Sequence, residues 1–436
     1  MTNDVLLNNF FNRMNNLFRI LLCALLLIFG QSSNLFAQTT ERKKPKIKNF
    51  GSSIYRKPQD NLTPKKPKTN NVSTDEEVIR IDTNLVVVDC LVIDKKGNAI
   101  KGLKREDFII TEDNQTQEIQ TFTLGDDTKL PRSIVLIIDY SGSQLPYIER
   151  SVEAAKILVD KLRPNDLMAV VTDDVEIISQ FTADKVKLKK ELDSLKKDAY
   201  KKRFGKSLQF SSLYAVLNEM FDEEDVRPII LFQTDGDQLD SLKGGQMEIL
   251  RNSSLFPFRF PFPIANFTFN DLLQKVEKSR TTIYSIVPGI RRIGLTEEEK
   301  KERIKAEQEN YRKIYEQIFG RRYPTPQPPS QEQEVRLKKQ QELINKAYPN
   351  GLPDPQDAMY SLSQLSGGWI DFLEKPEDAE GVYSRILSEI NTRYIIGFSP
   401  TNEAKDGKRR VVKIEVKGHP EYIVWGRKTY IAPLPD

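Results

Sequence analysis

The sequence predicts an α/β protein: a doubly wound, mainly parallel sheet with helices on both faces, joined to a small β-sandwich-like domain. Three observations support this class. Apolar runs long enough for buried strands alternate with segments of helical spacing between residues 131 and 373. Two of these runs end in an acid, Asp139 and Asp235. Short β-rich stretches at 78–126 and 374–436 flank this region, and neither has enough strands for a stable sheet of its own.

The first 37 residues have the features of a secretory signal. Arg13 and Arg19 precede an apolar run over residues 20–29, which is too short to span a bilayer comfortably. Ala37 provides the small residue of a cleavage site, and an uncleaved anchor is the alternative. We therefore expect a protein that is secreted, periplasmic or associated with the outer envelope.

Residues 38–77 are predicted to be a basic, disordered linker. Between residues 38 and 68 there are ten Lys or Arg residues against two acids, with almost no large apolar side chains. A solvated tail is one interpretation, and attraction to an anionic envelope surface is the other. The export signal and the lack of interleaved aromatic residues argue against nucleic acid as a partner.

The two flanks are expected to form one β-domain together. The strand candidates are residues 85–93, 108–110 and 119–122 before the α/β region, and 394–398, 411–416 and 422–425 after it. Removal of the signal leaves Cys90 as the single cysteine, so no internal disulfide can form. Cys90 alternates with valines in the first strand candidate, which indicates a buried thiol.

The α/β region, 131–373, is predicted to alternate strands and helices. The expected strands are 133–139, 166–172, 175–181, 227–234, 281–287 and 369–373. The expected helices are 145–162, 185–200, one that begins near Ser212, and 356–366. Such alternation is typical of a sheet that is covered on both faces.

The loop after the first buried strand carries the candidate site. Asp139, Ser141 and Ser143 lie between that strand and a helix, so alternate residues can direct three oxygens into one cavity. This cavity would lie at the carboxyl end of a central strand, where open α/β sheets bind ligands. Carboxylate and hydroxyl oxygens suit a hard cation, with Mg²⁺ as the first expectation and Mn²⁺ or Ca²⁺ as alternatives.

Two further residues complete a recognisable pattern. Asp235 ends a second buried strand, and Ser211 lies just before a helix between the two strands. With these residues the sequence resembles a von Willebrand factor type A (VWFA) domain, whose metal-ion-dependent adhesion site (MIDAS) reads Asp-x-Ser-x-Ser, then Thr, then Asp. The corresponding positions here are Asp139, Ser141, Ser143, Ser211 and Asp235, with Ser211 in place of the Thr. The β flanks extend the resemblance to the bacterial VWFA-related group, over about residues 78–238 and 356–434.

The resemblance implies a function as well as a fold. It implies one divalent cation at these five residues, and a protein partner that supplies an acidic side chain to that cation. A structural envelope protein with an idle metal site is the alternative from a different class.

Catalysis is not expected. The single His419 lies in a turn-like stretch, and the sequence has no phosphate-binding glycine loop. An Asp after a first strand also occurs in Asp-dependent phosphatases, but these need a second acid two residues later, where this chain has Ser141.

Two insertions interrupt the α/β region, at 239–270 and 291–355. The first contains six phenylalanines and three prolines between residues 253 and 270, which predicts either a loop packed on the domain or an exposed apolar patch. The second contains two charged helices separated by a proline-rich turn, which suggests a helical hairpin. Both leave from carboxyl ends of strands, so we expect them to surround the metal face.

Overall fold

The computed structural model describes residues 44–55, 85–127, 130–202, 207–222, 225, 227–253, 264–320, 322, 328–349 and 354–435. The predicted signal and the linker residues 38–43 and 56–77 lie outside these ranges. No helix of the described part has both the length and the apolar character that a membrane crossing requires.

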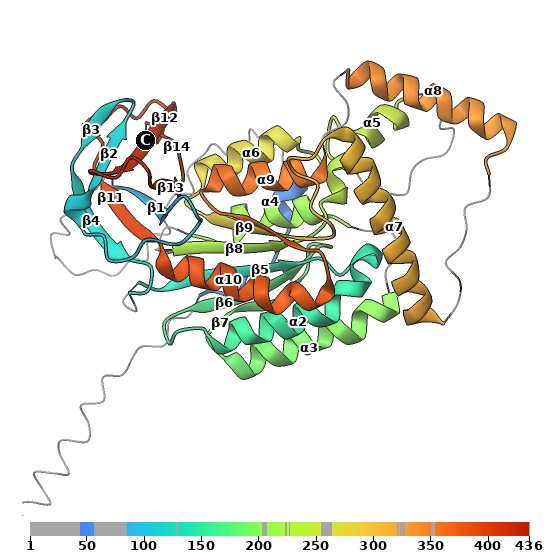
Figure 1. Cartoon of the computed structure of the whole chain (residues 1–436), viewed down its shortest axis with the longest axis horizontal. Helices are drawn as coiled ribbons and strands as arrows, with labels where there is room; N and C mark the ends of the chain where they lie inside the picture. The colour runs from blue at the N-terminus through green and yellow to red at the C-terminus, as the bar shows by residue number, and fades with distance from the viewer. Residues whose placement is uncertain are drawn as a thin grey trace, which may run out of the picture. The chain divides into compact units, whose positions relative to one another are not determined.

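A six-stranded sheet forms the centre of the α/β domain, in the order β10-β9-β8-β5-β6-β7 (Figure 1). The strands are β5 (Arg132–Ile138), β6 (Leu167–Thr172), β7 (Ile177–Thr182), β8 (Arg227–Gln233), β9 (Thr282–Pro288) and β10 (Ile370–Leu373). Every neighbouring pair is parallel except β6 and β7. β5 and β8 are buried along their whole length, as their unbroken apolar runs require. The predicted mainly parallel sheet is confirmed.

Helices cover both faces of this sheet, as Figure 1 shows. One face packs against α2 (Leu145–Asp160), α3 (Lys185–Lys202) and α10 (Ala379–Thr392). The other packs against α4 (Gln209–Glu219), α6 (Phe269–Lys278) and α9 (Pro355–Ser366). Alternate residues of β5 serve the two cores: Ile134 and Leu136 face the first layer, whereas Val135 and Ile137 face the second. The domain is therefore doubly wound.

The two flanks of the chain pair with each other, as expected. One antiparallel sheet has the order β13-β1-β11-β4 and the other the order β14-β12-β2-β3. Their strands are β1 (Val86–Ile93), β2 (Phe108–Glu112), β3 (Gln115–Gln117), β4 (Ile119–Leu124), β11 (Tyr394–Phe398), β12 (Arg409–Val416), β13 (Ile423–Gly426) and β14 (Thr429–Ile431). Residues of both sheets share one apolar core, which includes Cys90, Ile110, Phe398 and Val412. Cys90 is a free, fully buried thiol, and burial raises its pKa to about 12.

Buried charges join the β-domain to the α/β domain. Asp89 of β1 forms ion pairs with Arg393, which is fully buried, and with Arg227 at 3.0 Å. Arg393 also binds Glu389 at 2.8 Å. Burial alone would raise the pKa of Asp89, but Arg393 and Arg227 outweigh it and lower that pKa. These residues fix the position of one domain against the other, because a charge left unpaired there would be costly.

Part of the predicted linker packs on the α/β domain. Residues 44–55 include a 3-10 turn, Ser52–Tyr55, and this turn contacts α4. Lys44 forms an ion pair with the buried Asp225. The backbone amides of Gly51 and Ser53 donate to the carboxylate of Glu219 at 2.8 and 2.6 Å. The apolar residues that pack against the core are Ile47, Phe50 and Ile54. For these residues the structure differs from the predicted disorder, because three apolar side chains and specific polar contacts outweigh the basic composition.

The insertions form α5 (Gln246–Arg251), α7 (Glu297–Phe319) and α8 (Gln331–Ala347), in addition to the start of α6. The two predicted charged helices of the second insertion are present, but they contact different neighbours: α7 packs against α2, and α8 against α5. Figure 1 shows them diverging rather than packing as a hairpin. In the first insertion, Phe267 stacks on Tyr214 with ring centroids 4.4 Å apart, and Phe269 packs against the core. Residues 254–263, with the other four phenylalanines, lie outside the described part.

Candidate metal centre

The loop after β5 and the loop after β8 meet at the carboxyl edge of the sheet. These two strands are neighbours in parallel register, with Ile138 opposite Gln233. The amide of Asp139 donates to the carbonyl of Gln233 at 2.9 Å, which extends the pairing by one residue. Asp139 and Asp235 are therefore brought side by side. Thr234, the residue before Asp235, forms a hydrogen bond with Asp139 across 95 positions of the sequence.

Four of the five predicted ligands form one hydrogen-bonded group. The hydroxyls of Ser141 and Ser143 lie 3.2 Å apart, and Ser143 donates to Oδ2 of Asp235 at 2.7 Å. Oδ1 of Asp139 accepts the amide of Ser141 at 2.9 Å, which fixes the loop conformation. Oδ2 of Asp139 accepts the hydroxyl of Thr234 at 2.8 Å. The loop thus gathers carboxylate and hydroxyl oxygens around one point.

The fifth predicted ligand lies outside this group. Ser211 is buried in the first turn of α4, and its hydroxyl accepts from Nε2 of Gln238 at 2.8 Å. Gln209, two residues earlier, is the α4 residue that contacts the acids. Its Nε2 donates to Asp139 at 3.0 Å and to Asp235 at 3.4 Å, while its Oε1 accepts the amide of Gln238 at 3.2 Å. Gln209 carries no hydroxyl, so a search for Ser or Thr passes over it.

A third acid belongs to the same cluster. Asp237 accepts a hydrogen bond from Nε2 of Gln209, and its amide donates to Asp235 at 3.3 Å. Gly236 between the two acids has a φ of +74°, a conformation that suits glycine and turns the chain back towards the site. The sequence signal was the Asp-Gly-Asp run after β8. Gln144 completes the cluster, since its Nε2 donates to Asp235 at 2.7 Å while its buried Oε1 has no partner among the described residues.

Burial and neighbouring charge disfavour the charged forms of two acids in this cluster, Asp139 and Asp237. Burial raises the pKa of Asp139 to about 7, and the nearby charges of Asp235 and Asp237 add to that effect. Burial, followed by the charge of Asp235, raises the pKa of Asp237 to about 6. Carboxylates that are crowded and dehydrated in this way favour a cation, which would relieve both causes. The donor set, acids with neutral hydroxyls, fits a hard divalent ion.

Histidine, cysteine and acid side chains alone do not build this centre: across the described ranges, no group of three or more such residues is arranged to hold a metal. His419 belongs to the other domain, where it stacks on Tyr422 and contacts Glu421 at 3.0 Å.

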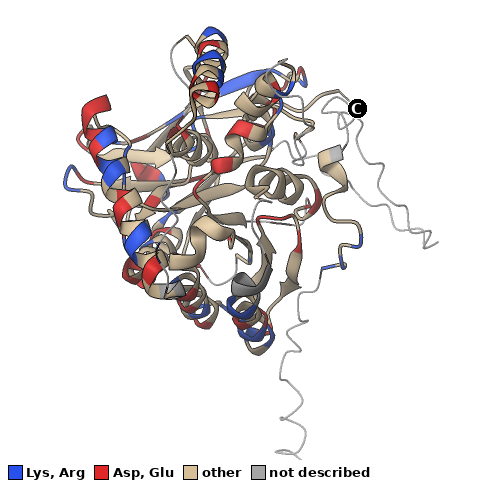
Figure 2. Ribbon diagram, turned by 90° about the vertical axis from the view of Figure 1, so that its right-hand side faces the viewer, with Lys and Arg blue, Asp and Glu red and all other residues tan. Residues whose placement is uncertain are grey.

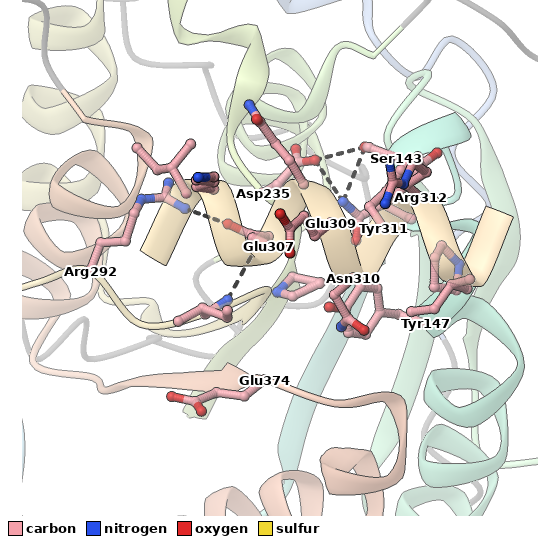
Figure 3. A pocket seen from close by; sticks show the side chains of 18 of the residues that line it. Ser143, Tyr147, Asp235, Arg292, Glu307, Glu309, Asn310, Tyr311, Arg312 and Glu374 are labelled. Carbon is pink, nitrogen blue, oxygen red and sulfur yellow. Dashed lines mark hydrogen bonds and ion pairs between the residues drawn. The ribbon is translucent and has the colours of Figure 1, made fainter. Parts of the chain in front are cut away.

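A cavity of about 920 Å³ opens above the centre, and α7 forms one of its walls. Figure 3 shows the α7 side chains Glu307 and Tyr311 beside Asp235 and Ser143. Tyr311 donates to the carbonyl of Gly142, inside the serine loop, at 3.1 Å. Glu307 forms an ion pair with Arg292 at 3.0 Å. The second insertion therefore lies beside the metal face, as its departure from β9 led us to expect.

The wall itself has mixed charge. α7 contains both acidic and basic residues, and Figure 2 shows both signs interspersed on the helices of this side. This wall therefore carries no electrostatic potential of a single sign, and selection of a ligand at this cavity would depend on local contacts.

No protein-family model matches the chain, and no curated protein matches it. Solved structures to which it is similar include three of interest. BatB from Bacteroides thetaiotaomicron has 12% identity, covers 59% of this chain and 98% of its own, and gives a TM-score of 0.34. The vWF domain of the type V pili tip protein Mfa5 from Porphyromonas gingivalis has 14% identity, 45% and 98% coverage, and a TM-score of 0.28. Proximal thread matrix protein 1 from the mussel byssus, with a zinc-occupied MIDAS motif, has 11% identity. The match covers 60% of this chain and 48% of that protein's chain, with a TM-score of 0.31.

The chain's own topology and site define its class. A doubly wound sheet in this strand order, with an Asp-x-Ser-x-Ser loop after β5 and an Asp after the adjacent β8, is a VWFA-like domain. Beside that domain, a β-sandwich is assembled from both flanks of the chain.

Proposed function

We propose that this protein binds a divalent cation at the loops after β5 and β8, and that the cation receives an acidic side chain from a protein partner. Asp139, Ser141, Ser143 and Asp235 would hold the ion, with Mg²⁺ first and Mn²⁺ or Ca²⁺ as alternatives. Ser211, predicted as the fifth ligand, lies outside the hydrogen-bonded group. Its role would be to accept the hydrogen bond that orients the side chain of Gln238. The ion would supply positive charge at a site that otherwise contains acids and neutral hydroxyls.

One observation carries this proposal: two acids and two serine hydroxyls form one hydrogen-bonded group, a third acid shares the Gln209 amide with them, and burial raises the pKa of Asp139 to about 7. A fold that needed only the loop shape would gain nothing from crowding these carboxylates, because the charges of Asp235 and Asp237 disfavour the ionisation of Asp139. The cavity above the centre leaves room for a side chain from outside. The signal-like N-terminus supports action in the envelope or outside the cell.

A structural role without metal is the second candidate, and one contact favours it. The amide group of Gln209 already donates hydrogen bonds to Asp139, Asp235 and Asp237. These donors partly replace the charge compensation that a cation would provide. In this alternative the domain is a scaffold, and its partner binding is independent of metal.

A pull-down from bacterial envelope extract separates the two functions. The protein is used with Mg²⁺ and with a chelator, next to Asp139→Ala and a surface control, Lys413→Ala, whose ion pair with Glu415 is exposed. Metal-dependent binding predicts partners that are lost with chelator and in Asp139→Ala but retained in Lys413→Ala. Partners that are the same in all four samples would support the scaffold instead.

A further inference from the structure

The edge strand β10 has an unpaired side. It is the first strand of the sheet order and, among the strands that the structure describes, pairs only with β9. The amide of Ser285 in β9 donates to the carbonyl of Trp369 at 2.9 Å. The amide of Gly289, just after β9, donates to the carbonyl of Leu373 at 2.8 Å. Since backbone amides and carbonyls alternate in direction along a strand, those of Ile370 and Phe372 point away from β9.

Little in the described residues occupies those outward groups. The amide of Phe372 donates to Oδ1 of its neighbour Asp371 at 2.9 Å, a local contact that a better acceptor could displace. The amide and carbonyl of Ile370 and the carbonyl of Phe372 have no hydrogen bond there. Such an edge is a template for another strand.

An apolar pocket lies at the amino end of β10. Its volume is about 720 Å³, and Trp369, Trp425, Phe372 and Tyr360 contribute to its lining. The two tryptophan rings lie 4.8 Å apart, and Nε1 of Trp425 donates to the carbonyl of Gly368 at 2.9 Å, so this wall is well defined. Because Trp425 comes from β13, the pocket is formed by both domains together.

A continuous line of cavities connects this pocket to the metal centre. Arg291, Asp371, Phe372 and Arg385 line both the tryptophan pocket and a smaller cavity of about 450 Å³ beside it. Glu374 lines both that smaller cavity and the cavity above the metal centre, at whose rim Figure 3 shows it. The groove therefore follows β10 from Trp369 to Glu374, about 17 Å at about 3.3 Å per extended residue.

We infer that this groove binds an extended segment of a partner protein, which adds a strand to β10 and inserts an apolar or aromatic side chain between the tryptophan pocket's walls. Beyond Glu374 the segment would continue across the end of β9 to carry an acidic side chain to the metal centre, a point that rests on the proposed function. The middle of the groove holds charges of both signs, with Arg385 paired to Asp371 at 2.6 Å. Backbone pairing and the two ends thus determine which segment binds.

The experiment uses a library of random twelve-residue peptides displayed on phage, panned against the full chain in Mg²⁺. The chain has two tryptophans, and both line the pocket, so their fluorescence reports its occupancy directly. Enriched peptides are synthesised and titrated against the wild type, Ile370→Pro and the control Ile370→Val. Proline removes an amide that does not pair with β9, so the sheet itself is retained.

We expect enriched peptides that carry an aromatic or large aliphatic residue and, more than five positions away, an acid, and that shift the tryptophan fluorescence. Ile370→Pro should weaken them at least tenfold, whereas Ile370→Val should not. N-methylation of the same peptide at alternate residues tests the pairing without altering the protein, and should also weaken binding tenfold. Peptides that bind Ile370→Pro and the N-methylated forms equally well, or no enrichment at all, would overturn the inference.

Two further outcomes remain distinct. If the peptides require Ile370 but ignore chelator and Asp139→Ala, the groove is right and the metal-dependent function is wrong. If metal binds but no peptide depends on Ile370, the groove is wrong and the metal proposal stands. Light scattering tests whether a second copy of this chain occupies the groove. A dimer that dissociates in Ile370→Pro would show that two copies pair through β10, which would contradict a partner segment.

Discussion

The hydroxyl of Ser143 donates a hydrogen bond to Oδ2 of Asp235 at 2.7 Å, across 92 residues of chain. This contact joins the loops after two adjacent parallel strands at the place where we propose a cation. It also orients the serine and the acid towards each other. Binding of an ion would then need little rearrangement of the loop.

Asp139→Asn should separate metal binding from stability. The substitution keeps the side-chain shape but removes a buried charge, so the metal affinity should fall at least tenfold. In the metal-free protein at pH 8, the free energy of unfolding should rise by on the order of 1–3 kcal/mol, because the carboxylate with the raised pKa is costly there. Urea unfolding with chelator measures this. A less stable Asp139→Asn would mean that loss of an acceptor for Thr234 and Gln209 outweighs the removal of the buried charge.

The pH dependence has a defined sign. The pKa of Asp139 rises from an ordinary value of 3.8 to about 7 on folding, so the folded state binds more protons than the unfolded state between these values. Stability is therefore present at the acidic end of this window and falls as the pH rises from about 4 to about 7. Saturating Mg²⁺ should reduce this decline, and Asp139→Asn should reduce it without metal. A thermal melt series from pH 5 to pH 8 provides the comparison; equal slopes for wild type and variant would contradict the assignment.

Gln209 should compete with the cation. Gln209→Thr removes amide donors from the acids and offers a hydroxyl, so we expect the metal affinity to increase several-fold. Ser211→Ala is the matched control on the same helix turn, and it should change the affinity less than threefold because its hydroxyl binds Gln238. Calorimetric titration with Mn²⁺ gives both values. A larger loss in Ser211→Ala than in Gln209→Thr would restore Ser211 as a ligand.

The domain junction should depend on Asp89. Asp89→Ala leaves the buried Arg393 and Arg227 without this shared carboxylate, which should cost about 3–5 kcal/mol of unfolding free energy. Glu415→Ala, which breaks the exposed pair with Lys413, should cost less than about 1 kcal/mol. Urea titrations followed by tryptophan fluorescence report the junction, since Trp425 lies next to it. Similar small losses in both variants would show that the two domains are held mainly by apolar contacts.

The contact of α7 with the serine loop should affect access rather than affinity. Tyr311→Phe removes the hydrogen bond to Gly142 but keeps the ring, so equilibrium metal affinity should change less than threefold. The rate of metal exchange, measured by stopped-flow mixing of the Mn²⁺-loaded protein with chelator, should increase because the helix is less firmly held. A large loss of affinity would instead make Tyr311 part of the centre.

Most of the fold could be predicted because strong local patterns dictate it. The apolar runs of β5 and β8 predict strands that are buried on both faces of a sheet, and both strands are buried along their whole length. Pairing of the two flanks followed from their lack of partners, and β1 indeed pairs with β11 and β13. The order of residues 44–55 could not be predicted in this way, since it depends on Glu219 and Asp225 of distant elements.

The centre shows a different limit. Asp139, Ser141 and Ser143 are fixed by one short loop, so their convergence was readable from spacing. Gln209 and Ser211 begin a helix and point about 200° apart on it, so the helix orientation decides which one meets the acids. Sequence spacing alone contains no such information. The separation of α7 from α8 likewise depends on their contacts with α2 and α5.

Calorimetric titration of the protein with Mg²⁺ and Mn²⁺, next to Asp139→Ala, determines whether this centre binds a divalent ion. We predict one divalent ion per wild-type chain, with micromolar to millimolar affinity and a higher melting temperature, and no binding to Asp139→Ala. Absence of both heat and thermal shift in the wild type at millimolar metal, or equal binding by Asp139→Ala, would contradict it.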